Sequence, residues 1–129
     1  MAEYKKFQEL ALYQAIEDLT LWLVPHIGKW PKWIRPTLGQ ETMHCLMNVL
    51  RSATTAYAAP SGHKLPHLEK ASADLDGLRM LLRISVSLHL TSHQQFAHAS
   101  TLVGDVGNQI GGWIKRVKKG AGGSACRRC

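Results

Sequence analysis

The sequence has few cysteines, few acidic residues and no long hydrophobic run. Three cysteines in 129 residues are too few for a disulfide framework, so we expect a reducing compartment, the cytoplasm. The longest apolar stretch, residues 19–24, is far shorter than the roughly 20 residues that cross a bilayer, and Pro25 follows it. The first nine residues carry four charged side chains and lack the apolar core of a signal peptide. No association with a membrane is expected.

Recognisable catalytic motifs are also absent. The sequence contains no Gly-rich phosphate loop, no nucleophile beside a base, and no paired carboxylates near a histidine. Two histidine pairs have a spacing of four (His63 with His67, His89 with His93), but each straddles an expected helix start or turn and lacks a completing acidic or thiol ligand. We therefore predict a protein that is not an enzyme and binds no cofactor and no metal.

The cysteines are predicted to have no metal role. Cys126 and Cys129 have a CxxC spacing, which is only half of a four-ligand zinc site, and we interpret them as an accessible thiol pair. Cys45 lies beside the apolar stripe of an expected helix and is predicted to be a small packed residue.

Apolar residues at steps of three and four predict four helices and no strands. The residues expected to face the core are Met43, Leu46 or Met47, Leu50, Ala53 and Tyr57 on the second helix, Leu68, Ala71, Leu75, Leu78, Leu82 and Val86 on the third, and Phe96, Ala99, Val103, Val106, Ile110, Trp113 or Ile114, and Val117 on the fourth. The first is expected over residues 4–30 with a kink or early end at Pro25, and the second after an N-cap at Thr37, ending before residue 60. The third starts near Pro66, and the fourth starts at Thr91 or Ser92, where Gln95 completes a capping-box pattern. Short connections between helices of similar length predict an all-α, up-down-up-down four-helix bundle over residues 1–119. Residues 120–129 are expected to be a flexible basic tail.

Positive charge is concentrated near the C-terminus. Residues 115–129 hold six of the sixteen Lys and Arg residues and no acid, whereas the preceding 114 residues carry a net charge of only +1. Four of these cations, Lys115, Arg116, Lys118 and Lys119, end the expected fourth helix. The helix dipole favours one or two cations there, but four without an acid favour a site for a polyanion such as nucleic acid.

Two further sets of cations are candidates for the same role. Arg79 and Arg83 lie four apart on the third helix, so they share a face with Asp76. They form either a solvated face with an Asp76–Arg79 pair or a guanidinium ladder for phosphates or an acidic partner. Lys32 and Arg35 alternate with tryptophans in the connection after the first helix, where bases could stack, although subunit packing explains the aromatic residues equally well.

A row of small residues follows the fourth helix beside its apolar seam. Glycine costs up to about 1 kcal/mol in a helix interior relative to alanine, so glycines here require a reason. Close approach of another backbone, inside the bundle or across a subunit interface, is the expected one. We therefore predict an oligomer interface that includes Gly104, Gly107, Gly111 and Trp113.

The most specific pattern is Val103-x-x-Val106-Gly107-x-x-Ile110-Gly111-x-Trp113-Ile114-x-Arg116-Val117, together with Leu78-Arg79-Met80-Leu81-Leu82-Arg83. With these motifs, the chain resembles the accessory variability determinant (Avd) proteins of diversity-generating retroelements over roughly residues 10–120. These proteins are a branch of the bacterial four-helix-bundle proteins that also includes proteins encoded in 23S rRNA intervening sequences.

The resemblance implies a homopentameric barrel whose basic surface binds nucleic acid, template RNA or DNA, and the retroelement reverse transcriptase. Such a protein supports cDNA synthesis and mutagenic retrohoming. Two alternatives remain open at this point. The chain could be a standalone nucleic-acid-binding bundle of the intervening-sequence type, or a purely structural helical oligomer whose basic residues only confer solubility.

Overall fold

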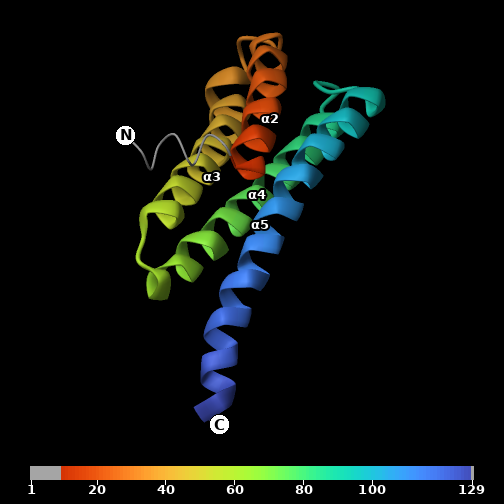
Figure 1. Ribbon diagram of the computed structural model, residues 1–129. Helices are drawn as coiled ribbons and strands as arrows, with labels where there is room; N and C mark the ends of the chain where they lie inside the picture. The colour runs from red at the N-terminus through yellow and green to blue at the C-terminus, as the bar shows by residue number, and fades with distance from the viewer. Residues whose placement is uncertain (1–9, 129) are drawn as a thin grey trace.

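Four α-helices make up most of the described chain. The computed structural model describes the backbone of residues 10–128 and the side chains of residues 10–120. The helices are α2 (Ala11–Gly28), α3 (Gln40–Ala58), α4 (Lys64–Ser87) and α5 (His93–Arg128). They run alternately up and down, and α5 extends well past the ends of the other three (Figure 1). The predicted all-α, up-down-up-down four-helix arrangement is therefore confirmed.

The helices pack around one core, with α3 along α4, α4 along α5, and α2 along α5. Leucine, isoleucine and valine at steps of three and four supply most of this core, as the spacing in α4 and α5 illustrates. Its fully buried members on these two helices are Leu68, Ala71, Leu75, Leu78, Leu82, Ala99, Val103, Val106 and Ile110. All nine were predicted from the periodicity of the sequence.

The stripe predicted for α3 is partly wrong. We expected Met43, Leu50 and Tyr57 to face the core, but these side chains are only half-buried at its edge. Val49 and Ala56 are fully buried instead. In both cases a neighbour one position earlier takes the inward place. The larger side chains of Leu50 and Tyr57 lie next to these buried positions, so a prediction from the pattern of large apolar residues alone favours the wrong positions.

The α2–α3 connection differs from the sequence-based expectation. Thr37 is not an N-cap, because it lies within a π-helical turn, Arg35–Gly39, and its hydroxyl donates to the Ile34 carbonyl oxygen at 3.1 Å. α3 begins at Gln40, after Gly39, where a Cβ atom would lie 3.1 Å from Ile27. This close approach of the turn to α2 requires a small residue.

The other helix ends follow the prediction more closely. α2 continues through Pro25, whose ring is exposed, and ends three residues later at Gly28. The capping box at the start of α5 is confirmed, because the Ser92 and Gln95 side chains each bond the other residue's backbone N–H, at 3.0 and 2.9 Å. The expected helix start at residue 4 lies outside the described residues.

Candidate nucleic-acid interface

Arg79 and Arg83 lie along the groove between α4 and α5, where both border a small cavity of about 130 Å³. Arg79 forms an ion pair with Asp76, as in the solvated-face alternative, with Nη1 2.7 Å from Oδ1. The guanidinium of Arg83 lies 6.0 Å from the centre of the Phe96 ring, within cation–π distance. Both side chains are exposed, yet each has a fixed neighbour. The two arginines therefore present their charge at defined positions on a rigid helix.

The row of small residues on α5 has two different environments. At Gly107, a Cβ atom would lie 2.6 Å from Arg79 Nη2, so the glycine makes room for a side chain of the same bundle. At Gly104 and Gly111, a Cβ atom would meet no described atom within 4 Å. Gly107 is thus explained inside the protomer. The other two glycines are not, and a closely packed second chain would explain them.

The cations at residues 115–119 lie where α5 passes the α3–α4 turn, because Arg116 and Gly120 line the same cavity as Ser61 and Gly62. Lys115, Arg116, Lys118 and Lys119 are all exposed, and none forms an ion pair within the described part of the chain. They do not end the helix, as we had expected, because α5 continues to Arg128. The helix dipole acts mainly within the last turn, so it does not account for this cluster.

The helix extends through residues that we expect to form a flexible tail. That residues 120–128 are flexible stays a prediction. Cys129 of the expected thiol pair lies outside the described residues. Cys45 is half-buried against the core, as predicted, and burial, followed by Asp74 and Glu41, raises the pKa of its thiol. Cys45 is therefore protonated and unreactive at neutral pH.

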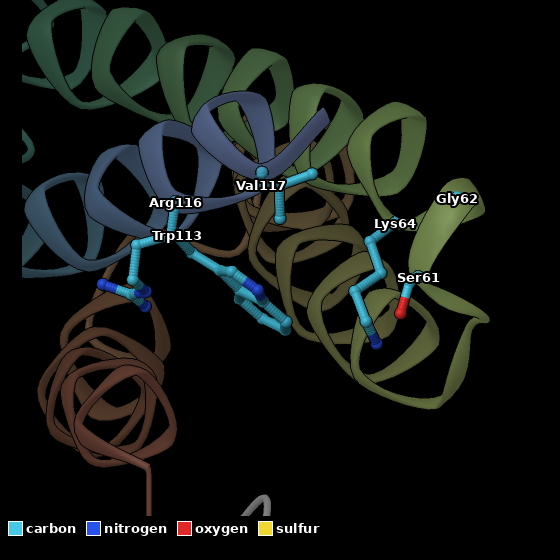
Figure 2. A pocket seen from close by; sticks show the side chains of 7 residues that line it. Ser61, Gly62, Lys64, Trp113, Arg116 and Val117 are labelled. Carbon is cyan, nitrogen blue, oxygen red and sulfur yellow. The ribbon is translucent and has the colours of Figure 1, made fainter. Parts of the chain in front are cut away.

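Trp113 lies on α5 one turn before the basic cluster and borders two adjoining cavities of about 490 and 400 Å³. Both cavities are also lined by Lys64 and Arg116, and the indole lies between these two side chains (Figure 2). The indole ring is half-buried and meets the Tyr57 ring edge-on, with the ring centres 6.5 Å apart. A hollow with an aromatic wall and cationic borders thus adjoins the basic cluster.

Lys64 is held in place by the end of α3. Its Nζ donates hydrogen bonds to the carbonyl oxygens of Ala56, Tyr57 and Ala59, at 2.9, 3.0 and 2.7 Å. These carbonyls lie in the last turn of α3 and directly after it, where few backbone donors remain, so the ammonium group caps the helix. The sequence reading missed this role, because it depends on the α3–α4 turn that brings residue 64 back to the end of α3.

Lys32 and Arg35 lie at the opposite end of the bundle from the cluster at residues 115–119. The α2–α3 connection meets the C-terminal end of α4, whereas the cluster lies near the α3–α4 turn. Arg35 donates to the Gly28 carbonyl oxygen at 3.3 Å, and Lys32 is exposed. Trp30 is buried and unavailable for base stacking, which leaves the exposed Trp33. The predicted basic residues therefore form separate sites on one protomer.

A buried polar network that the sequence reading missed joins α2 to the α4–α5 turn. His26 Nε2 lies 2.8 Å from Thr91 Oγ1, which lies 2.7 Å from Ser85 Oγ, and Ser85 donates to the Leu82 carbonyl oxygen at 2.6 Å. Trp30 Nε1 donates to the same His26 nitrogen at 3.4 Å, so Nε2 accepts hydrogen bonds and His26 is neutral in this network. Burial, and then Lys29, lower the pKa of His26. The helical period of α2 places His26 on the inward side of the helix, and this spacing is the sequence feature that could have indicated its burial.

Because of this network, we expect the bundle to become less stable in mild acid. Because the pKa of His26 is lowered in the folded state, the unfolded chain binds more protons below the ordinary histidine pKa of 6.5. The free energy of unfolding should therefore be highest above this pH and decrease as the pH falls below it. Urea titrations at pH 7.5 and 5.5 measure this decrease.

Two variants distinguish the contribution of His26 to the pH dependence of stability from that of the other histidines. His26→Gln should flatten the dependence of stability on pH, although the variant is less stable at every pH because its packing changes. His44→Gln, at an exposed position on α3, should keep the wild-type dependence. An unchanged slope in His26→Gln would show that other groups cause the acid sensitivity.

Within the described residues, no group of three or more His, Cys, Asp or Glu side chains is placed to hold a metal ion. No described helix combines the length and apolar character that crossing a bilayer requires. The comparison with curated proteins gives no match. The sequence model of the bAvd-like family matches residues 10–117, which include α2, α3, α4, most of α5 with Trp113, and the start of the basic cluster.

Proposed function

Because this chain belongs to the bAvd-like family, we propose that it is a non-enzymatic accessory protein of a diversity-generating retroelement. In this role it binds the retroelement reverse transcriptase and nucleic acid, supporting cDNA synthesis and mutagenic retrohoming. The family match over residues 10–117 carries the proposal. It confirms the resemblance identified from the α4 and α5 motifs, and the family consists of accessory proteins without catalytic activity.

The charges on α5 support the nucleic-acid part of the proposal. Lys115, Arg116, Lys118 and Lys119 are exposed and clustered, and they form no ion pair with an acidic side chain of residues 10–120, which is the arrangement that attracts a phosphate backbone. A surface that served only solubility would carry interspersed acids and bases. Arg79 and Arg83 form a second, more rigid site that suits an acidic protein surface or phosphates.

The direct test is a reconstitution. Reverse transcriptase, template RNA and this chain are purified, and cDNA synthesis primed on the template is measured with and without the chain. Synthesis that depends on the chain supports the proposal. Binding of nucleic acid without any effect on the enzyme would favour a standalone binding protein instead. A reverse-transcriptase gene with adjacent template and variable repeats in the same locus is the corresponding genomic observation.

We also propose that the chain assembles into a closed ring, which the family resemblance sets at five subunits. Apolar side chains exposed on the outer face of α4 support the assembly, namely Met80, Ile84 and Leu88, each 45–59% exposed. The open space beside Gly104 and Gly111 offers a second contact surface. Closed cyclic symmetry buries such surfaces without leaving open ends.

Light scattering should therefore give a mass close to five times the 14.3 kDa of one chain. Leucine at Gly104 and Gly111 should leave the protomer folded, since neither Cβ has a near neighbour, but should block close packing and reduce the mass. Gly28→Leu, at an equally open position on α2, is the control. A monomeric wild type would refute the ring, and a full-size glycine variant would move the interface elsewhere.

A further inference from the structure

The hollow around Trp113 has the size and lining of a small-ligand site. Its two cavities, about 490 and 400 Å³, share three residues and fall within the range of roughly 300–1,000 Å³ that is typical of ligand pockets. The remaining lining is mostly apolar or small, and no acidic side chain of residues 10–120 belongs to it. These lining residues are Ser61, Gly62, Val117 and Gly120 on one side, and Leu10, Ala11, Leu12, Tyr57 and Gln109 on the other.

The charges at this hollow select an anionic ligand. Three hydrogen bonds hold the Lys64 ammonium group at the end of α3. Arg116 is exposed, forms no ion pair within residues 10–120, and reaches the opposite side of the indole (Figure 2). A ligand that enters here therefore meets an aromatic surface between two cations, one fixed and one free to form new bonds.

An unpaired nucleotide combines the features that such a hollow recognises. Its base has a flat π-face that stacks on an indole, and its phosphates pair with a guanidinium. The bases of a double helix are already stacked and paired, so they cannot enter without being flipped out, at a cost in free energy. Lys115, Lys118 and Lys119 follow on the same helix and can carry the neighbouring phosphates.

We propose that the Trp113 hollow is a stacking site for an unpaired base, so that the protein prefers single-stranded nucleic acid to a duplex. The inference rests on the proposed nucleic-acid binding and specifies its ligand. It also gives Trp113 a function within each protomer, in place of the oligomer contact predicted from the sequence. Arg116 is the residue that pairs with the phosphate of the stacked nucleotide.

Fluorescence anisotropy with labelled RNA tests the proposal on the wild-type chain. Three RNAs with the same total number of nucleotides are compared at one salt concentration: a single strand, the same strand with scattered abasic sites, and a blunt-ended duplex. The intact single strand should bind about 5- to 150-fold more tightly than the abasic strand, which is the usual effect of losing one stacked base. The duplex should bind as weakly as the abasic strand. Equal affinity for all three RNAs would overturn the inference.

Two substitutions then locate the effect. Trp113→Leu should remove the preference for the intact strand, and Trp113→Phe, which keeps an aromatic face, should retain most of it. Both should keep the salt dependence of the wild type, because the lysines are unchanged. If Trp113→Leu does not fold, the comparison of intact and abasic RNA on the wild type still decides the question.

Failure of this inference differs from failure of the proposed function. If no RNA binds even at low salt, the proposed nucleic-acid role is wrong. If all RNAs bind and Trp113→Leu behaves as the wild type, the role stands and the stacking site is wrong. A Trp113→Leu variant that changes only the mass in light scattering would assign the hollow to a subunit contact and overturn the stacking site as well.

Discussion

Replacing Lys115, Lys118 and Lys119 by alanine should greatly weaken binding of nucleic acid. Each lysine that contacts a phosphate releases counterions, so the logarithm of affinity falls with the logarithm of salt concentration by about 0.7 per contact on a single strand. Loss of three contacts should therefore lower the magnitude of this slope by about 2 for each protomer engaged. For a fourfold rise in salt, the fold-loss of affinity in the variant would then be about 16 times smaller than in the wild type.

The matched control removes the same charge elsewhere. Lys29, Arg51 and Lys70 are exposed and lie outside the proposed sites, so their joint replacement by alanine lowers the net charge of the protomer equally. This control should keep the wild-type salt slope, since only cations at the contact contribute to it. Anisotropy titrations from 50 to 300 mM salt compare the three proteins. Equal slopes in both triple variants would mean that binding depends on net charge alone and that the cluster on α5 is not a site.

The fold was largely accessible from the sequence because its two best-patterned helices are also the most regular. Residues 68–82 and 99–110 place aliphatic side chains at the inward positions, most of them large, so the helical period alone identifies the core. The reading failed where geometry departs from a straight helix. The π-helical turn Arg35–Gly39 shifts the start of α3, and small residues such as Ala56 take inward positions that hydrophobicity does not single out.

The candidate sites were only partly accessible, for a different reason. A run such as Lys115–Lys119 is local, and a spacing of four places Arg79 and Arg83 on one face, so both sets can be read directly. The hollow at Trp113 and the His26 network depend on residues that are distant in the chain. His26 and Thr91 are 65 positions apart, and Lys64 meets Trp113 only because α3, α4 and α5 converge there. No periodicity in the sequence encodes these encounters.

The double variant Arg79→Ala with Arg83→Ala should abolish co-purification with the cognate reverse transcriptase while leaving the bundle intact. Neither side chain belongs to the core, and the exposed Asp76–Arg79 pair contributes at most about 1 kcal/mol to stability. Truncation of one half of a desolvated charge pair commonly costs about 2–5 kcal/mol of binding free energy. Thermal melting and light scattering run beside the pull-down establish that the fold and assembly are native.

Gly107→Ala provides a second test of Arg79 that keeps its charge. The new Cβ atom would lie 2.6 Å from Arg79 Nη2, so the guanidinium must leave its present position, while alanine favours the helix by up to about 1 kcal/mol. If the position of Arg79 matters, this variant should be at least as stable as the wild type yet capture less reverse transcriptase. Full capture by Gly107→Ala together with loss in the double variant would show that the charge, but not its placement, is required. If both variants capture the reverse transcriptase fully, the two arginines do not belong to the partner site, which must then lie elsewhere on the protein.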